Sequence, residues 1–137
     1  MQTILDSNVL LDVIYEDSHW TNWSLKWLAK FQQSGELVTN AVIFSEALGR
    51  FHNLSDANAI MSRFGIDYED IPESAAHAAG LAHAHYRRRG GERVRTLPDF
   101  LIGAHAEARG HRLITRDAAR YRTYFPQLDI IAPDTHP

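Results

Sequence analysis

The sequence of 137 residues contains no cysteine, which excludes disulfide bonds and thiolate metal sites. No apolar run approaches the ~18 residues that a membrane-spanning helix needs. The first residues also lack the basic region and apolar run of a signal peptide. We therefore expect a cytoplasmic protein without membrane contact. The hydrophobic fraction of 45% and the charged fraction of 23% are ordinary for a globular protein, and the length suits one domain over residues 1–137.

Charge is unevenly distributed along the chain, although its net value is only −3. Residues 1–70 carry 10 acids against 4 lysines and arginines, whereas residues 71–137 carry 7 acids against 10 arginines. Such an asymmetry indicates contact with nucleic acid, and arginine is well suited to bidentate phosphate contacts. A solvated protein face gives the same pattern, so both interpretations stay open.

Short apolar segments alternate with helical patterns, which predicts an α/β fold: a three-layer α/β/α sandwich around a short, mainly parallel sheet. We expect helix caps at Ser7 or Asn8, at Thr21, at Thr39–Asn40 and at Ser55. The predicted strands are 2–5, 36–39, 66–68, 111–115 and 129–131. One predicted helix begins near residue 8. The other predicted helices cover 21–34, 41–51, 55–64, 72–89 and 97–109.

Acidic residues stand where ligand sites of parallel sheets form, at the turns from strands into helices. Asp6 follows the first strand, Asp117 follows the strand at 111–115, and Asp99 begins a helix. Glu46 is an acid within an otherwise apolar helix. Each has a structural alternative, because Asp6 can cap a helix, Glu46 can face solvent, and Asp99 can form a capping box with Thr96.

Four carboxylates at one sheet edge would repel one another unless a cation lies between them. An all-oxygen donor set suits Mg²⁺ or Mn²⁺ and supports phosphodiester hydrolysis, in which the metal lowers the pKa of a water molecule. His77, His83 and His85 lack the i, i+4 spacing of helical zinc ligands, so we expect no metal site there.

Two further groups of residues have both a structural and a functional interpretation. Five arginines around Gly90 form either a solvated helix end or a loop that contacts phosphates; they are Arg87, Arg88, Arg89, Arg93 and Arg95. Four aromatic residues at helical spacing are either core or part of a groove for an apolar partner segment; they are Trp20, Trp23, Trp27 and Phe31.

Four motifs resemble the PIN-domain nucleases, specifically the VapC-type toxins of bacterial toxin–antitoxin pairs. They are LDSNVLLD at 5–12, Ser45–Glu46, PDFLIGA at 98–104 and LITRD at 113–117. Their order and spacing cover nearly the whole chain. The resemblance implies a PIN-like fold and an Mg²⁺-dependent endoribonuclease that acts as the toxin of its pair.

The resemblance also implies roles for individual residues. Asp6, Glu46, Asp99 and Asp117 match the family's acidic quartet, and Asn8 and Thr115 match its supporting polar positions. Ser7 stands where many members have threonine. The implied partners are RNA, an antitoxin that contacts the aromatic helix, and a second copy of the chain. Arg116 and the arginines of 87–95 would hold the RNA backbone.

Two other classes of protein remain possible from the sequence. An aspartyl-nucleophile phosphatase would need a second aspartate two residues after Asp6, where this chain has Asn8. A non-catalytic PIN-fold module would bind RNA or a protein only, but all four acids are present, which argues against a degenerate site.

Overall fold

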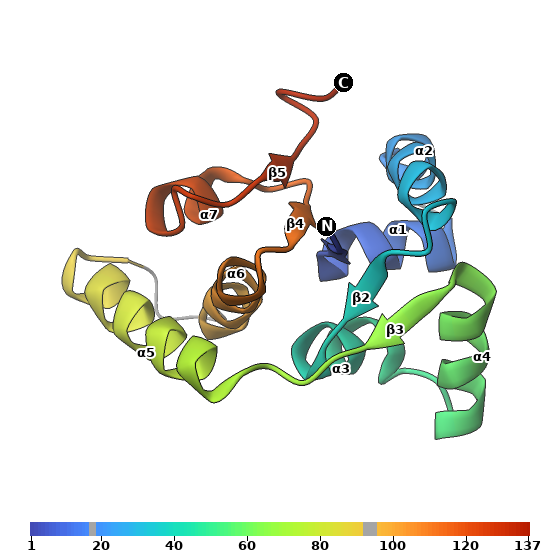
Figure 1. The fold of residues 1–137 in the computed structure, drawn as a ribbon, viewed down its shortest axis with the longest axis horizontal. Helices are drawn as coiled ribbons and strands as arrows, with labels where there is room; N and C mark the ends of the chain where they lie inside the picture. The colour runs from blue at the N-terminus through green and yellow to red at the C-terminus, as the bar shows by residue number, and fades with distance from the viewer. Residues whose placement is uncertain (17–18, 92–95) are drawn as a thin grey trace.

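A parallel sheet of five strands lies at the centre of the computed structural model, which describes residues 1–16, 19–91 and 96–137 (Figure 1). The strand order is β3-β2-β1-β4-β5, and every neighbouring pair is parallel. The α/β prediction is therefore confirmed. The strands are β1 (Thr3–Leu5), β2 (Leu37–Thr39), β3 (Ile66–Tyr68), β4 (Arg112–Ile114) and β5 (Ile130–Ile131).

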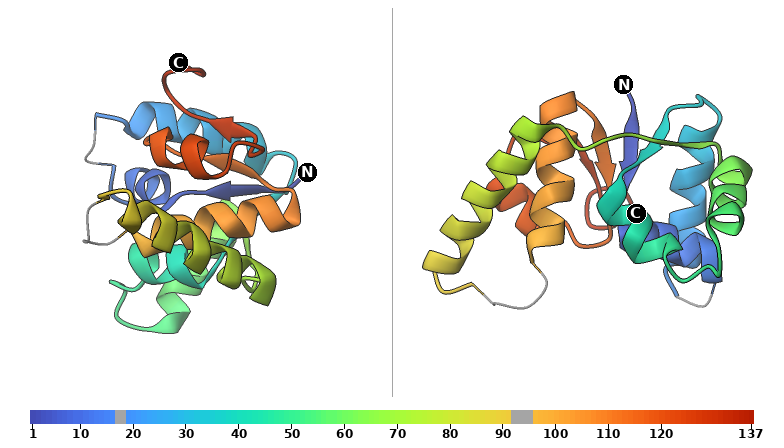
Figure 2. Two further views of the ribbon diagram at one scale, coloured as in Figure 1. Left: turned by 90° about the vertical axis from the view of Figure 1, so that its left-hand side faces the viewer. Right: turned by 90° about the horizontal axis from the view of Figure 1, so that it is seen from below.

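Helices cover both faces of the sheet (Figure 2). The chain moves from β1 outward to β3 and then crosses to β4, so right-handed crossovers place α1–α4 on one face and α5–α7 on the other. Among the described residues, no helix is long and apolar enough to cross a membrane. The helices are α1 (Ser7–Tyr15), α2 (Thr21–Gln32), α3 (Ala41–Leu48), α4 (Leu54–Phe64), α5 (Glu73–Arg88), α6 (Leu97–Arg109) and α7 (Ala119–Tyr124).

Three helix starts differ from the sequence-based expectation. Asp6, rather than Ser7 or Asn8, caps α1, and Asn53, rather than Ser55, caps α4. Thr21 does not cap α2, because its hydroxyl donates to the carbonyl oxygen of Asp12 at 3.3 Å. The cap at Asn40 is confirmed, since its side chain accepts a hydrogen bond from the N–H of Ile43.

Two helices are also shorter than predicted. α2 ends at Gln32 and not at residue 34, and α3 ends at Leu48 and not at residue 51. The strands are likewise shorter by a residue or two at several ends. These differences leave the carboxyl edge of the sheet, where the candidate site lies, as expected.

Close packing between α6 and α7 determines the position of several site residues. A Cβ atom at Gly103 of α6 would lie 2.5 Å from the ring of Phe125 and 3.1 Å from the ring of Tyr121. Only glycine therefore lets these two aromatic rings approach α6 so closely. This contact fixes Tyr121, a core residue that reaches toward the end of β1.

Candidate active site

Asp6 is the buried centre of a group of polar side chains at the carboxyl end of β1. It is 5% exposed, and its Oδ1 accepts a hydrogen bond from the backbone N–H of Ser7 at 2.7 Å. Its Oδ2 accepts hydrogen bonds from the hydroxyls of Thr115 at 2.8 Å and Tyr121 at 3.0 Å. Asp6 is thus both a helix cap and a member of the polar group, so the two interpretations of this residue are compatible.

Asn8 and Thr115 join the loop after β4 to the start of α1. The side-chain oxygen of Asn8 accepts a hydrogen bond from the backbone N–H of Arg116 at 3.3 Å. The hydroxyl of Thr115 accepts one from the backbone N–H of Asp117 at 3.1 Å while it donates to Asp6. These two residues therefore hold the two strand ends in a fixed relation.

Asp99 lies in the first turn of α6 but does not form the predicted capping box. Thr96 makes no side-chain cap, because its hydroxyl is hydrogen-bonded to Nε2 of His83 at 2.9 Å. The carboxylate of Asp99 instead accepts a hydrogen bond from the guanidinium of Arg120 at 2.5 Å. Because α6 runs antiparallel to the following strand, its N-terminus reaches the carboxyl edge of the sheet.

Three of the four predicted acids line one open cavity of about 420 Å³. Glu46 is exposed on α3, and its Oε1 accepts a hydrogen bond from the hydroxyl of Ser7 at 2.6 Å. Asp117 is exposed and lines a neighbouring cavity instead. The residues around the first cavity are Asp6, Ser7, Asn8, Leu11, Glu46, Arg50 and Asp99.

Electrostatic coupling nevertheless links all four acids. Burial raises the pKa of Asp99, Arg120 opposes this effect, and the charges of Glu46 and Asp117 raise it further. Burial also raises the pKa of Asp6 to about 6, and the charge of Asp99 adds to the shift. The groups that lower the pKa of Asp6 are two hydroxyls and a backbone amide, not a cation.

Tyr121 and Arg120 are site residues that the sequence reading missed. Burial and the nearby carboxylates of Asp6 and Asp99 raise the pKa of Tyr121 well above 10, so its hydroxyl stays protonated and donates to Asp6. Both residues belong to α7, which begins two residues after Asp117. Their closeness to Asp117 in the sequence was the one feature that could have indicated a place in the site.

The predicted RNA-contacting arginines occupy different surroundings. Arg87, Arg88 and Arg89 are exposed at the end of α5 and do not line the acid-lined cavity, and Arg93 and Arg95 lie outside the described residues. Arg116 is held in an ion pair, with its Nε 2.9 Å from Oδ2 of the buried Asp12. It also lines the cavity beside Asp117.

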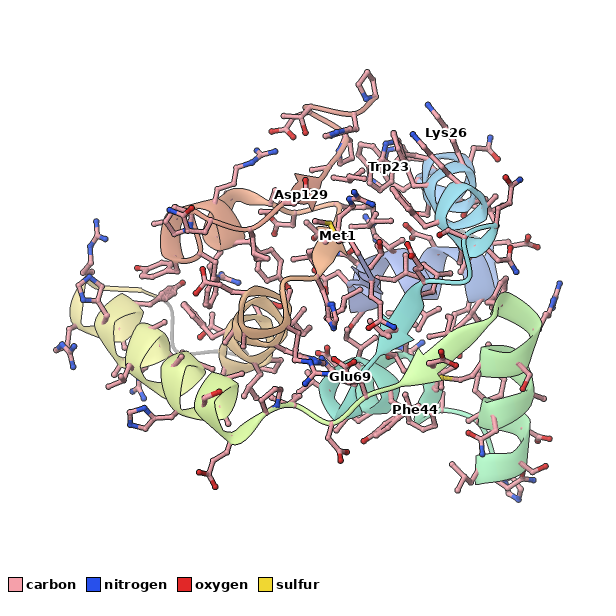
Figure 3. The ribbon with its side chains drawn as sticks, viewed as in Figure 1. Met1, Trp23, Lys26, Phe44, Glu69 and Asp129 are labelled. Atoms are coloured by element: carbon pink, nitrogen blue, oxygen red, sulfur yellow. The ribbon has the colours of Figure 1, made fainter. Side chains whose placement is uncertain are left out.

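The C-terminal residues of the chain cover part of the aromatic face of α2 (Figure 3). Trp27 is only 8% exposed, and its ring lies edge-on to that of His136 with centroids 5.4 Å apart. The indole N–H of Trp23 donates to the carbonyl oxygen of His136 at 2.7 Å. Trp20 and Phe31 are half-buried, and Trp20 lines the cavity beside Asp117.

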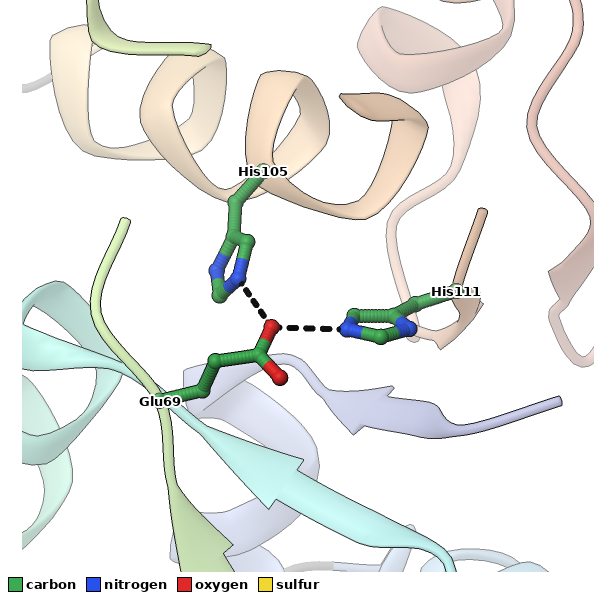
Figure 4. Close-up of side chains that lie close together, drawn as sticks. All are labelled: Glu69, His105 and His111. Carbon is green, nitrogen blue, oxygen red and sulfur yellow. Dashed lines mark hydrogen bonds and ion pairs between the residues drawn. The ribbon is translucent and has the colours of Figure 1, made fainter. Parts of the chain in front are cut away.

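A second cluster, Glu69, His105 and His111, brings three potential ligand atoms within 4.8 Å of one another (Figure 4). One carboxylate oxygen of Glu69 lies 2.7 Å from Nε2 of His105 and 2.8 Å from Nε2 of His111. This cluster was not predicted from the sequence, because its three residues come from the end of β3, from α6 and from the residue before β4.

The hydrogen bonds around His105 favour a structural role for this cluster. Asn40 uses its side-chain oxygen for Ile43, so its NH₂ group faces Nδ1 of His105 at 2.9 Å. His105 therefore carries its proton on Nε2 and donates to Glu69. Burial alone would raise the pKa of Glu69, but hydrogen bonds from the two histidines lower it overall. The cluster thus joins β3, α6 and β4 in the absence of a metal.

Comparison with solved structures supports the fold. FitAcB from Neisseria gonorrhoeae has a TM-score of 0.69 at 16% identity and covers 99% of this chain and 100% of its own. DNA-bound VapBC from Salmonella typhimurium has a TM-score of 0.67 at 19% identity, covering 96% and 98%. A toxin–antitoxin complex from Klebsiella pneumoniae has a TM-score of 0.54 at 16% identity, with the same coverage. Because the identities are low, these structural matches establish the fold alone.

Sequence comparison gives the family. No curated protein matches the chain significantly, but the family model described as "PIN domain" matches residues 3–126, which include all four acids. The chain belongs to the PIN domain family.

Proposed function

We propose that this chain is a metal-dependent endoribonuclease of the VapC type, with residues 1–137 forming one nuclease domain. The observation that carries the proposal is the convergence of Asp6, Glu46 and Asp99 on one open cavity, with Asp117 in electrostatic contact with Asp99. Buried carboxylates with raised pKa values are costly for a fold, and such costs are concentrated at functional sites.

The donor set of this cavity fits Mg²⁺ or Mn²⁺. The candidate ligands are carboxylate oxygens, which hard divalent cations prefer. The raised pKa of Asp6 marks a negative charge that the protein itself leaves uncompensated. A divalent cation held by Asp6 and Asp99, with Glu46 and Asp117 nearby, would lower the pKa of a water molecule and neutralise charge developing on a phosphate.

The surrounding residues would then orient the acids and the substrate. Thr115, Tyr121 and the N–H of Ser7 hold both oxygens of Asp6 in place. Ser7 directs Glu46 toward the cavity, which suits Glu46 to accept a proton from the attacking water. Arg120 holds Asp99. Preorganised groups of this kind need no rearrangement during the reaction.

The partners proposed for the chain follow from its relatives. Similar structures are named as VapBC, as FitAcB and as a toxin–antitoxin complex, so we propose a cognate antitoxin as the binding partner. The homodimer is proposed from the sequence resemblance alone. The aromatic face of α2 is the proposed antitoxin contact. A partner segment that docks there would displace residues 136–137 from Trp23 and Lys26.

RNA cleavage by the purified, partner-free chain tests the proposal. We expect total structured RNA to be cut with Mg²⁺, but not with EDTA and not by Asp99→Asn, since that substitution removes a metal ligand. The melting temperature of Asp99→Asn should not fall, because the pKa of Asp99 is raised despite its ion pair with Arg120, so burial and the repulsion by Glu46 and Asp117 already disfavour its charged form.

The matched control is Asp67→Asn, which changes an exposed acid of β3 outside the cavity and should cleave at the wild-type rate. Folded wild-type protein that cuts no RNA would contradict the proposal and favour the binding-module alternative. Equal cleavage by Asp99→Asn would contradict the assignment of the site.

A further inference from the structure

A second cavity, of about 490 Å³, lies beside Asp117. Trp20, just before α2, and Pro133, after β5, line it together with two arginines and two aspartates, which are Arg116, Arg122, Asp117 and Asp134. Its volume falls within the ~300–1,000 Å³ that is usual for small-ligand pockets. Because Asp117 lines this cavity, a molecule bound here would lie beside one of the four proposed catalytic acids.

The indole of Trp20 is held in position by other rings. It lies 6.5 Å from Trp23 in an edge-on arrangement and 4.7 Å from the imidazole of His19. Stacking of a nucleobase on an aromatic side chain is favourable and tolerates any base. A half-buried indole in a cavity beside acids that would cleave phosphodiesters is therefore suited to an unpaired base.

The two arginines of this cavity differ in their availability to a phosphate. Arg116 is paired with Asp12, which is 3% exposed, so it is committed to the protein core. Arg122 is paired with Asp134 at 2.6 and 2.9 Å, but these side chains are 39% and 62% exposed. Exposed ion pairs contribute little to stability, so a phosphate can replace Asp134 on Arg122 at small cost.

We propose that this cavity, the Trp20 subsite, binds one unpaired nucleotide of the RNA substrate next to the scissile phosphate. The base stacks on Trp20 and the adjoining phosphate contacts Arg122. This inference rests on the proposed ribonuclease function and adds to it a base-stacking contact at Trp20, which a base can make only after leaving its own stack.

Binding of a fluorescein-labelled eight-nucleotide RNA of mixed sequence, followed by anisotropy, tests the subsite. The protein carries Asp99→Asn throughout, so that the RNA is not cut. Adding Trp20→Ala should weaken binding about tenfold, which corresponds to ~1.4 kcal/mol of lost stacking. Trp20→Phe should keep most of the affinity, since phenylalanine retains an aromatic face. Tyr68→Ala is the matched control on the exposed surface of β3 and should bind as the parent does.

Abasic RNA separates stacking from a general effect on the fold. We would prepare eight RNAs, each with one abasic nucleotide at a different position. One of them should bind the parent protein about tenfold more weakly than intact RNA does. For that RNA, Trp20→Ala should cause no further loss of affinity. Arg122→Ala should weaken binding of every RNA and reduce the salt dependence by about one phosphate contact. Asp134→Ala should bind at least as tightly as the parent.

Each outcome bears on a separate claim. The subsite would be overturned if Trp20→Ala lost as much affinity for every abasic RNA as it loses for intact RNA. It would also be overturned if Trp20→Ala bound intact RNA as tightly as the parent does. Wild-type protein that cleaves RNA while Trp20→Ala cleaves with unchanged kcat/KM would refute the subsite but leave the ribonuclease proposal standing. Failure of the wild type to bind or cut any RNA would refute both.

Discussion

Asp6 should make the stability of the metal-free protein fall as pH rises from 5 to 7.5. Burial raises the pKa of this carboxyl from 3.8 to about 6, so the folded state binds its proton more tightly than the unfolded state does. The stabilisation is complete below the unfolded pKa and is lost as pH rises through the folded pKa. The full difference of about two pH units corresponds to roughly 3 kcal/mol. About 1.4 kcal/mol of it is lost between pH 5 and pH 7.5, which is a shift of roughly 5 °C in melting temperature for a chain of this size.

Thermal melting in EDTA at pH 5 and pH 7.5, compared between wild type and Asp6→Asn, measures this effect. The amide oxygen of Asn still accepts from Ser7, and the hydroxyls of Thr115 and Tyr121 can rotate to accept from its NH₂ group. His105 acts in the opposite direction, because burial lowers its pKa and its stabilising neutral form is lost as pH falls. The difference between the two proteins therefore isolates Asp6.

The expected result is a variant that is more stable than wild type at pH 7.5, with the advantage shrinking at pH 5. Mg²⁺ should stabilise wild type at pH 7.5 and leave Asp6→Asn almost unchanged, because bound cation compensates the buried charge. Parallel pH dependences of the two proteins in EDTA would refute the reasoning.

Two further substitutions test the packing and the second cluster. Gly103→Ala should lower the free energy of unfolding by about 1–3 kcal/mol in urea denaturation, because the added methyl group lies 2.5 Å from the ring of Phe125; an unchanged midpoint would mean that α6 and α7 are not packed this closely. Glu69→Gln should lower the free energy of unfolding by about 1–3 kcal/mol, because the charge-assisted hydrogen bonds with His105 and His111 are lost. RNA cleavage should be retained. If Zn²⁺ stabilised the wild type but not the variant, the cluster would instead hold a metal.

The positions of the acids along the chain were sufficient to predict where most of them lie in space. Asp6 follows a central strand, and in a parallel sheet the carboxyl ends of strands meet at one edge. Asp99 reaches the same edge because the helix before β4 must run antiparallel to it. Periodicity of apolar residues therefore predicted the fold, and the positions of the acids at turns and helix starts predicted the sheet edge near which they lie.

Contacts between side chains of different elements could not be predicted in this way. The Thr96 and Asp99 spacing is that of a capping box, yet Thr96 is hydrogen-bonded to His83 and Asp99 to Arg120, both from other helices. The aromatic periodicity of α2 could not show that the C-terminal residues of the chain cover Trp27. Likewise, Glu69, His105 and His111 have no common spacing and meet only in the folded chain.

The chemistry of the cut ends tests the central claim most directly. RNA cleaved in H₂¹⁸O by wild type with Mg²⁺ should carry a linear terminal phosphate that contains ¹⁸O, because water attacks the phosphorus, and Asp99→Asn should give no such product. Ends that carry a 2′,3′-cyclic phosphate without ¹⁸O would mean that the ribose hydroxyl is the nucleophile. That result would contradict a ribonuclease site built on Asp6, Glu46, Asp99 and Asp117.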